Sequence, residues 1–301
     1  MDISVVVPTL NGREELTGCL DALTEQVPDA EVIVVNGPSA DGTTGMVRDR
    51  DDVSLLVEIA DRSVTVARNA GIDRATGDVI ALVHQSLSVE SGWADAVKDG
   101  LSGAAQAITG PTHQQLWAGM TTETEETRTI AGRDVTYFNP GNVAFDAEVV
   151  EALDGFDEYL NVGSARDFAH RMAAGEYGVD WSTEMCVSRE FEADGGIAET
   201  DWNWKYRSLA YRLVKNYNVR PTVVRRILSH AVGDAKDALF DVVRGETTPS
   251  QWLGTGQDVF GGVGSGIVDG VRARVTDRTA RRNPNGRSAR TNRAVTVYDW
   301  R

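Results

Sequence analysis

The sequence predicts an α/β fold, with a mainly parallel central sheet followed by a helical carboxyl-terminal extension. Short apolar runs alternate with helix-length segments from the amino terminus to about residue 190, which is typical of βαβ units. The first two runs, residues 4–7 and 31–35, each end in a polar turn, with one helix-length segment between them. We therefore expect one α/β domain over residues 1–200 and a different, helical part over residues 201–301.

The elements of the α/β part follow from the hydrophobic pattern and from the residues that bound each run. Residues 78–83 include a continuous apolar run that ends before His84, which predicts a buried strand. Residues 114–134 are polar and rich in Thr and Glu, which predicts a loop or ribbon over the site. The other expected elements are strands at 52–59 and 107–110, a strand that 137–145 leads into, a return to the sheet edge at 179–187, and helices at 64–75, 92–101, 147–153 and 164–174.

The carboxyl-terminal part has a different pattern. Residues 202–216 and 234–243 are predicted to be helices. Residues 252–271 are rich in Gly, which permits either close helix packing or a loop at a lipid surface. A polar Arg/Asn tail at 278–293 precedes the final run, 294–298.

The composition indicates in which cellular compartment the protein is expected. Cys19 and Cys186 are too few for a disulfide framework, which favours a reducing environment. The amino terminus lacks the pattern of a signal peptide, and no stretch approaches the roughly 18 apolar residues of a spanning helix. We therefore expect a cytoplasmic protein. A net charge of −15 with few Lys residues favours a high-salt, haloarchaeal cytoplasm, because concentrated salt screens crowded carboxylates.

The charge is unevenly distributed. Residues 1–202 hold 37 acids and 12 bases, whereas residues 203–230 hold seven bases and no acid. The helix at 202–216 interleaves aromatics with bases, which suits either an anionic membrane surface or packing on the sheet. Both interpretations stay open for residues 202–230, and the first predicts a peripheral protein on the inner face of the cell membrane. Nucleic acid is not an expected partner, because the acidic body repels a phosphate backbone.

Polar side chains gather in the turns after the first two strands. The carboxyl ends of parallel strands open at one edge of a sheet, and ligands bind there. A helix cap explains each polar residue by itself, but the two turns in this order favour a nucleotide's base and ribose. The turn residues are Thr9, Asn11, Asn36, Ser39 and Asp41.

In their order, six segments resemble the family-2 inverting glycosyltransferases of the GT-A fold. They lie at residues 8–11, 36–43, 67–71, 77–81, 91–93 and 154–158. The resemblance covers about residues 3–190 and implies a nucleotide-sugar donor and an acceptor hydroxyl. It further implies a nucleotide site at Pro8, Thr9, Asn11, Asn36, Asp41 and Arg68, and an acceptor side lined by Asn139, Asn142, Asp157 and Glu158.

The sequence departs from the family at the two places that carry the chemistry. The family's metal-binding Asp-x-Asp after the fourth strand is replaced by residues 84–86, His-Gln-Ser. Its Glu-Asp base pair at a helix start is replaced by Ser164 and Ala165, and a His that helps to hold the metal is replaced by Arg189. No residue is therefore assigned to manganese or magnesium.

Three interpretations of these departures stay open. In the first, the enzyme works without a metal: His84, Arg166 and Arg189 supply fixed positive charge for the donor's diphosphate. Ser86 also binds the diphosphate, and Asp167 or Glu190 is the base. In the second, the fold keeps a nucleotide or glycan site but has lost turnover. In the third, the alignment is shifted, and the true ligands lie nearby, at residues such as Glu90 or Asp95.

The favoured function is hexosyl transfer with inversion, at the cytoplasmic face of a membrane, as part of glycan biosynthesis such as protein glycosylation. The donor would be a nucleotide-sugar, and the acceptor a glycan or a polyprenyl-phosphate-linked molecule. The alternative is a non-catalytic subunit that binds a nucleotide or glycan and partners an active transferase. Turnover separates the two.

Overall fold

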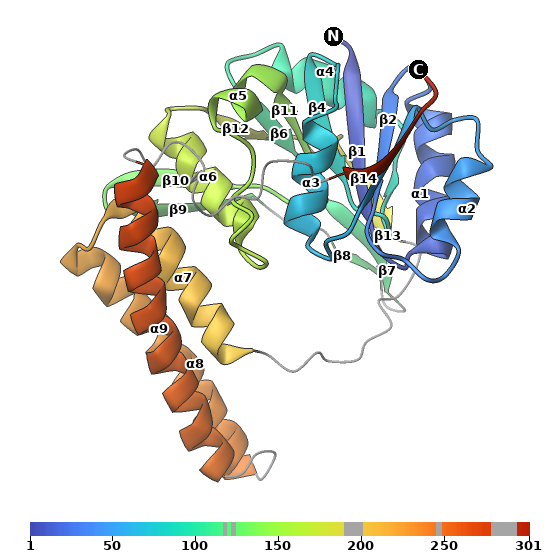
Figure 1. Ribbon diagram of the computed structural model, residues 1–301. Coiled ribbons are helices and arrows are strands. Elements are labelled where there is room, and N and C mark those ends of the chain that lie inside the picture. The colour runs from blue at the N-terminus through green and yellow to red at the C-terminus, as the bar shows by residue number, and fades with distance from the viewer. Residues whose placement is uncertain (117–118, 122–124, 190–200, 245–248, 278–293) are drawn as a thin grey trace.

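Four parallel strands form the centre of the protein. The computed structural model describes residues 1–116, 119–121, 125–189, 201–244, 249–277 and 294–301 (Figure 1). An eight-stranded sheet has the order β12-β6-β11-β4-β1-β2-β3-β14. Every residue of β1 and β4 is buried, as continuous apolar runs with helices on both faces should be. The parallel strands are β1 (Ile3–Thr9), β2 (Glu31–Asn36), β3 (Leu55–Ile59) and β4 (Val79–Val83).

Beyond β4 the sheet becomes mixed. β11 (Asn142–Asp146) is antiparallel to both β4 and β6 (Ala107–Thr109). β12 (Val179–Trp181) pairs in parallel with β6 at the edge of the sheet. The strand expected after 137 and the return to the sheet edge at 179–187 are thus confirmed.

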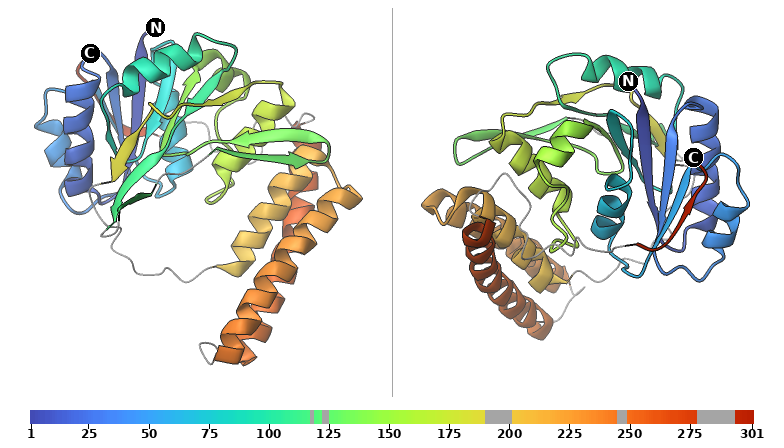
Figure 2. Two further views of the ribbon diagram at one scale, coloured as in Figure 1. Left: turned by 180° about the vertical axis from the view of Figure 1, so that it is seen from behind. Right: turned by 45° about the horizontal axis from the view of Figure 1, so that its top comes forward.

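Helices cover the two faces of the sheet and create two cores (Figures 1 and 2). Alternate residues of β1 point to opposite sides, so that Val5 and Val7 enter one core and Val6 the other. The first core takes α1 (Arg13–Gln26), α2 (Thr43–Arg48) and α4 (Trp93–Leu101). The second takes α3 (Val64–Ile72), α5 (Ala147–Ala152) and α6 (Ser164–Ala174).

The polar segment expected to be a loop or ribbon is a pair of small β structures. β9 (Glu126–Ile130) and β10 (Arg133–Tyr137) form an antiparallel hairpin. A second, four-stranded sheet has the order β5-β13-β7-β8. Its strands are β5 (Ser88–Val89), β13 (Val187–Arg189), β7 (Thr112–Leu116) and β8 (Gly119–Thr121).

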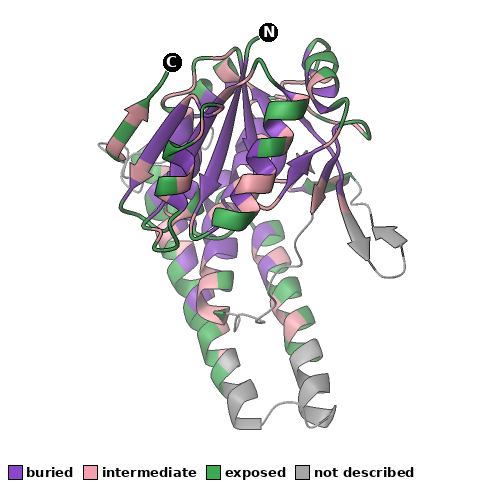
Figure 3. Cartoon of the chain, turned by 90° about the vertical axis from the view of Figure 1, so that its right-hand side faces the viewer, coloured by how far each residue is buried: buried purple, intermediate pink, exposed green. Residues whose placement is uncertain are grey.

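The carboxyl-terminal extension is a helical arm that projects from the α/β body (Figure 1). It consists of α7 (Trp202–Tyr217), α8 (Pro221–Arg244) and α9 (Pro249–Asp277). The helix expected at 234–243 is the second half of α8, and the Gly-rich segment lies inside α9. Burial is densest in the sheet and in the nearby ends of the helices (Figure 3). None of the helices in the described ranges is both long enough and apolar enough to span a membrane.

Glycines in α9 let it lie against α7 at backbone distance. A Cβ at Gly262 or Gly266 would stand 2.3 Å from a backbone carbonyl oxygen of α7, and one at Gly270 would stand 2.8 Å from another. These glycines recur every fourth residue and therefore share one helix face. Of the two alternatives for the Gly-rich segment, close helix packing is the one confirmed.

The packing of the arm also buries aromatic side chains of α7. Tyr206, Leu213 and Tyr217 are buried in a cluster between α7, α8, α9 and the β9–β10 hairpin. The expectation that these aromatics face lipid is therefore wrong, because they supply the core of the arm.

The last strand corrects the expected domain boundary. β14 (Ala294–Asp299) pairs antiparallel with β3 and extends the central sheet. Arg301 donates to a Glu31 carboxylate oxygen over 2.8 Å, and the Arg48 guanidinium lies over the Tyr298 ring. Residues 294–301 thus belong to the α/β domain, and the described part of the extension is the arm.

Gly266 offers a stability test with a matched control in the same helix. We expect Gly266→Ala to lower the free energy of unfolding by about 1–3 kcal/mol, because the new methyl group meets the Arg207 carbonyl. A Cβ at Gly264 meets nothing within 4 Å. Gly264→Ala should therefore stabilise the helix by up to about 1 kcal/mol. Urea unfolding of both variants checks this, and equal midpoints would contradict the packing.

Candidate functional site

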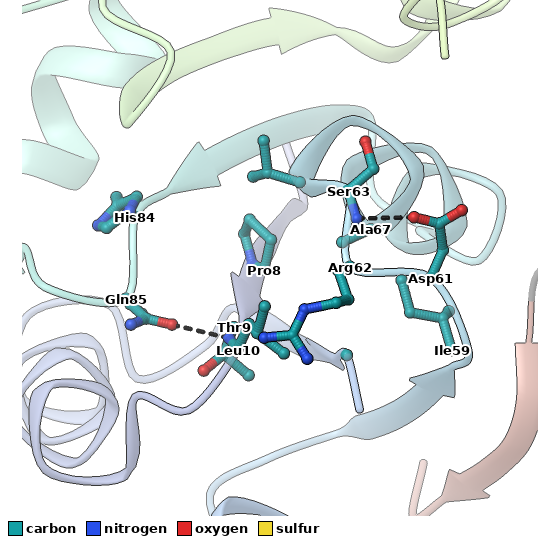
Figure 4. Close-up of a pocket in the computed structure, with 12 residues that line it drawn as sticks. Pro8, Thr9, Leu10, Ile59, Asp61, Arg62, Ser63, Ala67, His84 and Gln85 are labelled. Carbon is teal, nitrogen blue, oxygen red and sulfur yellow. Dashed lines mark hydrogen bonds between the residues drawn. The ribbon is translucent and has the colours of Figure 1, made fainter. Parts of the chain in front are cut away.

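A cavity of about 220 Å³ lies where the carboxyl ends of β1 to β4 meet (Figure 4). This is the edge at which parallel sheets bind ligands, and the sequence predicted a site there. Arg62 points across the opening toward the end of β1 (Figure 4). β1 contributes Pro8 and Thr9, the loop after β2 Gly37, the loop after β3 Asp61, Arg62 and Ser63, and the loop after β4 His84 and Gln85.

Several polar atoms at and near this cavity have no hydrogen-bond partner within the described residues. They are Thr9 Oγ1, Ser63 Oγ, Arg68 Nε and Arg189 Nε, and all are buried from solvent. Buried polar atoms are normally paired, because an unpaired one costs about 1–3 kcal/mol. A polar ligand would supply the missing partners.

His84 stands between two arginines. Burial, followed by the charges of Arg189 and Arg68, lowers the pKa of its imidazole below the ordinary value. Its Nδ1 accepts from the backbone N–H of Ser86 over 3.2 Å and contacts the Ser86 hydroxyl at 2.9 Å. The proton of the neutral ring is therefore on Nε2. His84 is thus not the fixed positive charge that the sequence suggested, but a neutral side chain whose Nε2–H can donate a hydrogen bond.

Arg68 carries the fixed charge beside the cavity. It lies on α3, is buried, and donates to the Pro140 carbonyl oxygen over 3.0 Å. Burial lowers the pKa of its guanidinium to about 10, so that it stays charged at neutral pH. Arg189, at the end of β13, acts on His84 as a second positive charge.

A larger groove of about 810 Å³ lies on the other side of the 139–140 segment. The β9–β10 hairpin, α6 and α7 form its walls. Arg212 lies at this groove and is partly buried, and its buried Nε has no partner among the described residues. Burial lowers the pKa of this guanidinium to about 10. The other side chains that line the groove include Glu125, Glu126, Arg128, Tyr137, Asn139, Arg166 and Trp181.

Residues 4–99 match the family described as "Glycosyl transferase family 2". That match spans β1 to α4 and so includes the four strands whose ends form the cavity. This part of the chain is similar to the family-2 glycosyltransferases.

Two curated glycosyltransferases are similar in sequence to this chain over part of their length. Glycosyltransferase AglE of Haloferax volcanii is 30% identical over 115 residues, which cover 36% of this chain and 38% of AglE. The uncharacterized glycosyltransferase YibD of Escherichia coli is 33% identical over 86 residues, covering 27% of this chain and 25% of YibD. The chain thus matches well under half of these family-2 relatives.

Solved structures establish the fold as GT-A. S. aureus TarS 1-349, in complex with UDP-GlcNAc, aligns with a TM-score of 0.64 and 16% identity, covering 87% of this chain and 82% of that one. The mannosyltransferase PcManGT of Pyrobaculum calidifontis, in complex with GDP-Man and Mn²⁺, aligns with a TM-score of 0.55 and 18% identity, covering 92% and 87%.

The end of β4 does not suit the hard divalent ion that the family's Asp-x-Asp would hold. Gln85 accepts from the Leu10 backbone N–H over 3.0 Å and donates to Glu15 over 2.7 Å, so both ends of its amide are engaged. Nδ1 of His84 is also engaged, and residues 84–86 offer no carboxylate. Magnesium and manganese prefer oxygen ligands, and residues 84–86 therefore do not offer the carboxylate pair of an Asp-x-Asp.

Most of the predicted turn residues hold the turns together. Asn11 Oδ1 accepts from the Ala40 N–H, and the Ser39 hydroxyl donates to Asn36 Oδ1. Asp41 accepts from the backbone N–H groups of Arg13 and Thr43 and so caps α1 and α2. Asp41 thus caps both helices, and Pro8 and Thr9 line the cavity, while nucleotide binding by these residues stays a prediction.

Asp167 cannot be the general base that the sequence suggested. Its side chain is fully buried, and its Oδ2 lies 2.9 Å from Arg171 Nε and 3.0 Å from Lys215 Nζ. Its Oδ1 accepts from Asn216 over 2.8 Å. The charges of Lys215 and Arg171 outweigh burial and hold the pKa of this carboxyl well below its ordinary value. Asp167 is a structural counter-ion, and Glu190 lies outside the described residues.

Three of the four expected acceptor residues are also structural. Asp157 is fully buried and accepts from Tyr211 and Lys215. Glu158 accepts from Asn69 over 2.8 Å. Asn142 is fully buried, accepts from Trp93 Nε1 and donates to the Met185 carbonyl. Only Asn139 lines the groove.

Sequence reasoning missed the contribution of β3. Asp61, Arg62 and Ser63 follow this third parallel strand and open at the same edge as the turns after β1 and β2. The rule that placed a site at the first two turns would have found them. Glu126 and Arg212 had no such signal, because they come to the groove from a hairpin and from the arm.

His84 gives this site a pH dependence. A bound pyrophosphate favours the cationic imidazole, so binding takes up a proton. Nucleotide-sugar affinity should therefore rise roughly tenfold as the pH falls from about 8 to 6. His84→Gln should remove most of that slope, since Arg68 stays charged throughout. Titration calorimetry at several pH values measures it, and an unchanged slope in the variant would rule out His84 as the responsive group.

Proposed function

We propose that the chain is a glycosyltransferase that moves a hexose from a nucleotide-sugar to an acceptor hydroxyl with inversion. One observation carries the proposal: the cavity at the ends of β1 to β4 lies within the family-2 segment and is bordered by buried, unpaired polar groups. In neighbours of this fold, donors of the same class are bound, namely UDP-GlcNAc in TarS and GDP-Man in PcManGT.

In this proposal, positively charged side chains stabilise the diphosphate in place of a divalent ion. As the sugar leaves, negative charge builds on the diphosphate and must be stabilised by groups already in place. Arg68 and Arg189 provide fixed charge, and His84 provides a donor that gains charge as the anion develops. Ser86 orients His84 through the contact with Nδ1.

The groove between the hairpin and α6 is the proposed acceptor site. Trp181, which is partly exposed, offers an aromatic face for a glycan ring. Arg128, Arg166 and Arg212 suit a phosphate, which favours an acceptor that carries one, such as a polyprenyl-phosphate-linked sugar. Asn139 and Pro140 line this groove, and Arg68, whose charge acts on His84, donates to the Pro140 carbonyl oxygen.

Glu126 is the proposed base. It and Glu125 are the carboxylates among the described residues that line the groove. Glu126 Oε2 lies 2.9 Å from Arg166 Nη2, and that arginine lies over the Tyr137 ring. Arg166 follows directly after Ala165, so Glu126 reaches the start of α6, where the family would place its own carboxylates. A carboxylate there can take the proton of an acceptor hydroxyl.

A membrane contact, if it forms, uses the arm rather than the aromatics of α7. Phe260, Val268 and Val275 are 76%, 67% and 70% exposed and lie on the face of α9 opposite its buried glycines. Exposed Arg272, on the same helix, adds positive charge near this apolar stripe. A helix with that pattern suits a surface of anionic lipid and would bring a lipid-linked acceptor near the groove.

The function is tested by turnover over a panel of nucleotide-sugars. We expect release of nucleoside diphosphate from one donor class when a phosphate-linked acceptor is supplied. Added Mn²⁺ should change the rate of nucleotide release by less than about twofold, because residues 84–86 offer no carboxylate pair to bind it. Tight donor binding without turnover on any acceptor would instead indicate the non-catalytic subunit, and no donor binding would reject the proposal.

Glu126→Gln tests the base separately from binding. The amide keeps the shape but cannot take a proton, so kcat should fall by about 10²–10⁴-fold. Donor affinity should stay within about twofold. Glu125→Gln is the matched control, because Glu125 lines the same groove, and it should retain most activity. A Glu126→Gln enzyme with normal kcat would rule out this role while leaving the proposed function intact.

A further inference from the structure

A cluster of three ligand-type side chains lies in the small sheet, outside the donor cavity and the acceptor groove. Glu90 follows β5, His113 is on β7, and Cys186 precedes β13. One ligand atom from each residue lies within 4.8 Å of the other two. These residues are far apart in sequence, and the pairing of β13 with β5 and β7 brings them together.

The contacts within the cluster show how close the ligand atoms already are. Glu90 Oε1 lies 3.0 Å from His113 Nδ1, and Cys186 Sγ lies 3.8 Å from His113 Nε2. Ligand atoms around a tetrahedral zinc ion are roughly 3.3–3.8 Å apart, given zinc–ligand bonds of about 2.0–2.3 Å. Glu90 and Cys186 contact different nitrogens of the His113 ring, and an imidazole binds an ion through one nitrogen only. The ring therefore has to turn so that one nitrogen faces both the carboxylate and the thiol, and the three ligand atoms, which already lie within 4.8 Å of one another, would then converge on one ion.

The local charge favours a cation. The imidazole of His113 is the one ion-pair partner recorded for Glu90 among the described residues. Burial, with the charges of Glu90 and Glu184, raises the pKa of the Cys186 thiol, whose S–H donates to the Thr183 carbonyl. Without a cation the thiol keeps its proton. A metal ion would displace that proton and bind the thiolate, as metal ions do at thiol ligands.

We propose that Glu90, His113 and Cys186 bind a Zn²⁺ ion. One sulfur, one nitrogen and one oxygen ligand suit zinc, and they suit the hard ions magnesium and calcium poorly. Cys186 is buried, while the His113 and Glu90 side chains are 20% and 35% exposed, so an ion could enter from solvent and keep a water as fourth ligand. The site is separate from the donor cavity, and its existence does not depend on the proposed transfer reaction.

The ion would affect the donor site indirectly, by fixing the position of β13. It would join β5, β7 and β13 at one point, and Arg189 lies three residues after Cys186 at the end of β13. Fixing β13 would hold Arg189 beside His84. The three ligands are therefore positioning residues with respect to transfer.

The test is a titration of the full-length, tag-free, metal-free chain with Co²⁺ and then Zn²⁺. We expect a thiolate-to-cobalt charge-transfer band that saturates at one equivalent and is displaced by Zn²⁺. Cys186→Ser should abolish the band, while Cys19→Ala, which removes the other thiol of the chain, should leave it unchanged. No band, or a band that survives Cys186→Ser, would overturn the proposal.

Thermal unfolding gives a second readout that does not depend on cobalt spectra. At a Zn²⁺ concentration about a hundredfold above its dissociation constant, Tm of the parent chain should rise. His113→Gln should fold but show no such rise, whereas His84→Gln should respond like the parent. Equal Tm shifts in the two histidine variants would contradict binding at this cluster.

Discussion

The structure depends on a buried ion cluster in which Lys215 of α7 bonds to Asp157 and Asp167 at 2.9 and 3.0 Å. All three side chains are fully buried, and Arg171 completes the charge balance through Asp167. Removing one member of such a cluster typically costs about 3–5 kcal/mol, because an uncompensated charge stays behind. The cluster ties the loop before α6, α6 itself and α7 together. It is what attaches the helical arm to the α/β body.

That constraint shapes the chemistry of the site. Two of the carboxylates that sequence reasoning placed at the reaction are committed to the scaffold and cannot move protons. The donor cavity, in turn, is lined by Arg62 and His84, and the charges of Arg189 and Arg68 act on His84. Residues 84–86 offer no carboxylate, so the end of β4 has the charge that a pyrophosphate needs without the carboxylate pair that the family uses for a divalent ion. A base then has to come from elsewhere, and Glu126 on the neighbouring hairpin is in the right groove.

The sequence predicted the parts that depend on local pattern. Apolar runs such as 78–83 and the bounds of α6 are set by short-range hydrophobic periodicity, and both are confirmed. The cavity at the strand ends followed from the order of strands and turns. Roles at single positions could not be predicted in the same way. Asp167 lies on α6 as expected, but its partner Lys215 is 48 residues away, so the sequence could not show that its carboxylate is occupied.

Other features could not be predicted for the same reason, because they depend on contacts between residues that are far apart in the sequence. The glycines of α9 predicted either close packing or a lipid loop, and only the contact with α7 decides between them. β14 pairs with β3 across more than 200 residues of chain, a pairing that no local signal marks. The interleaved aromatics and bases of α7 looked amphipathic because periodicity cannot distinguish a lipid-facing side from one buried against neighbouring helices.

The central claim is that cationic side chains, and no metal ion at the end of β4, hold the donor's pyrophosphate. A crystal structure of the full chain with a nucleotide-sugar and Mn²⁺ tests it most directly. The account predicts a pyrophosphate within hydrogen-bond distance of His84 Nε2 and of Arg68 or Arg189, with no ion between it and residues 84–86. A manganese ion bridging the pyrophosphate to the end of β4, or a donor bound away from the strand ends, would contradict it.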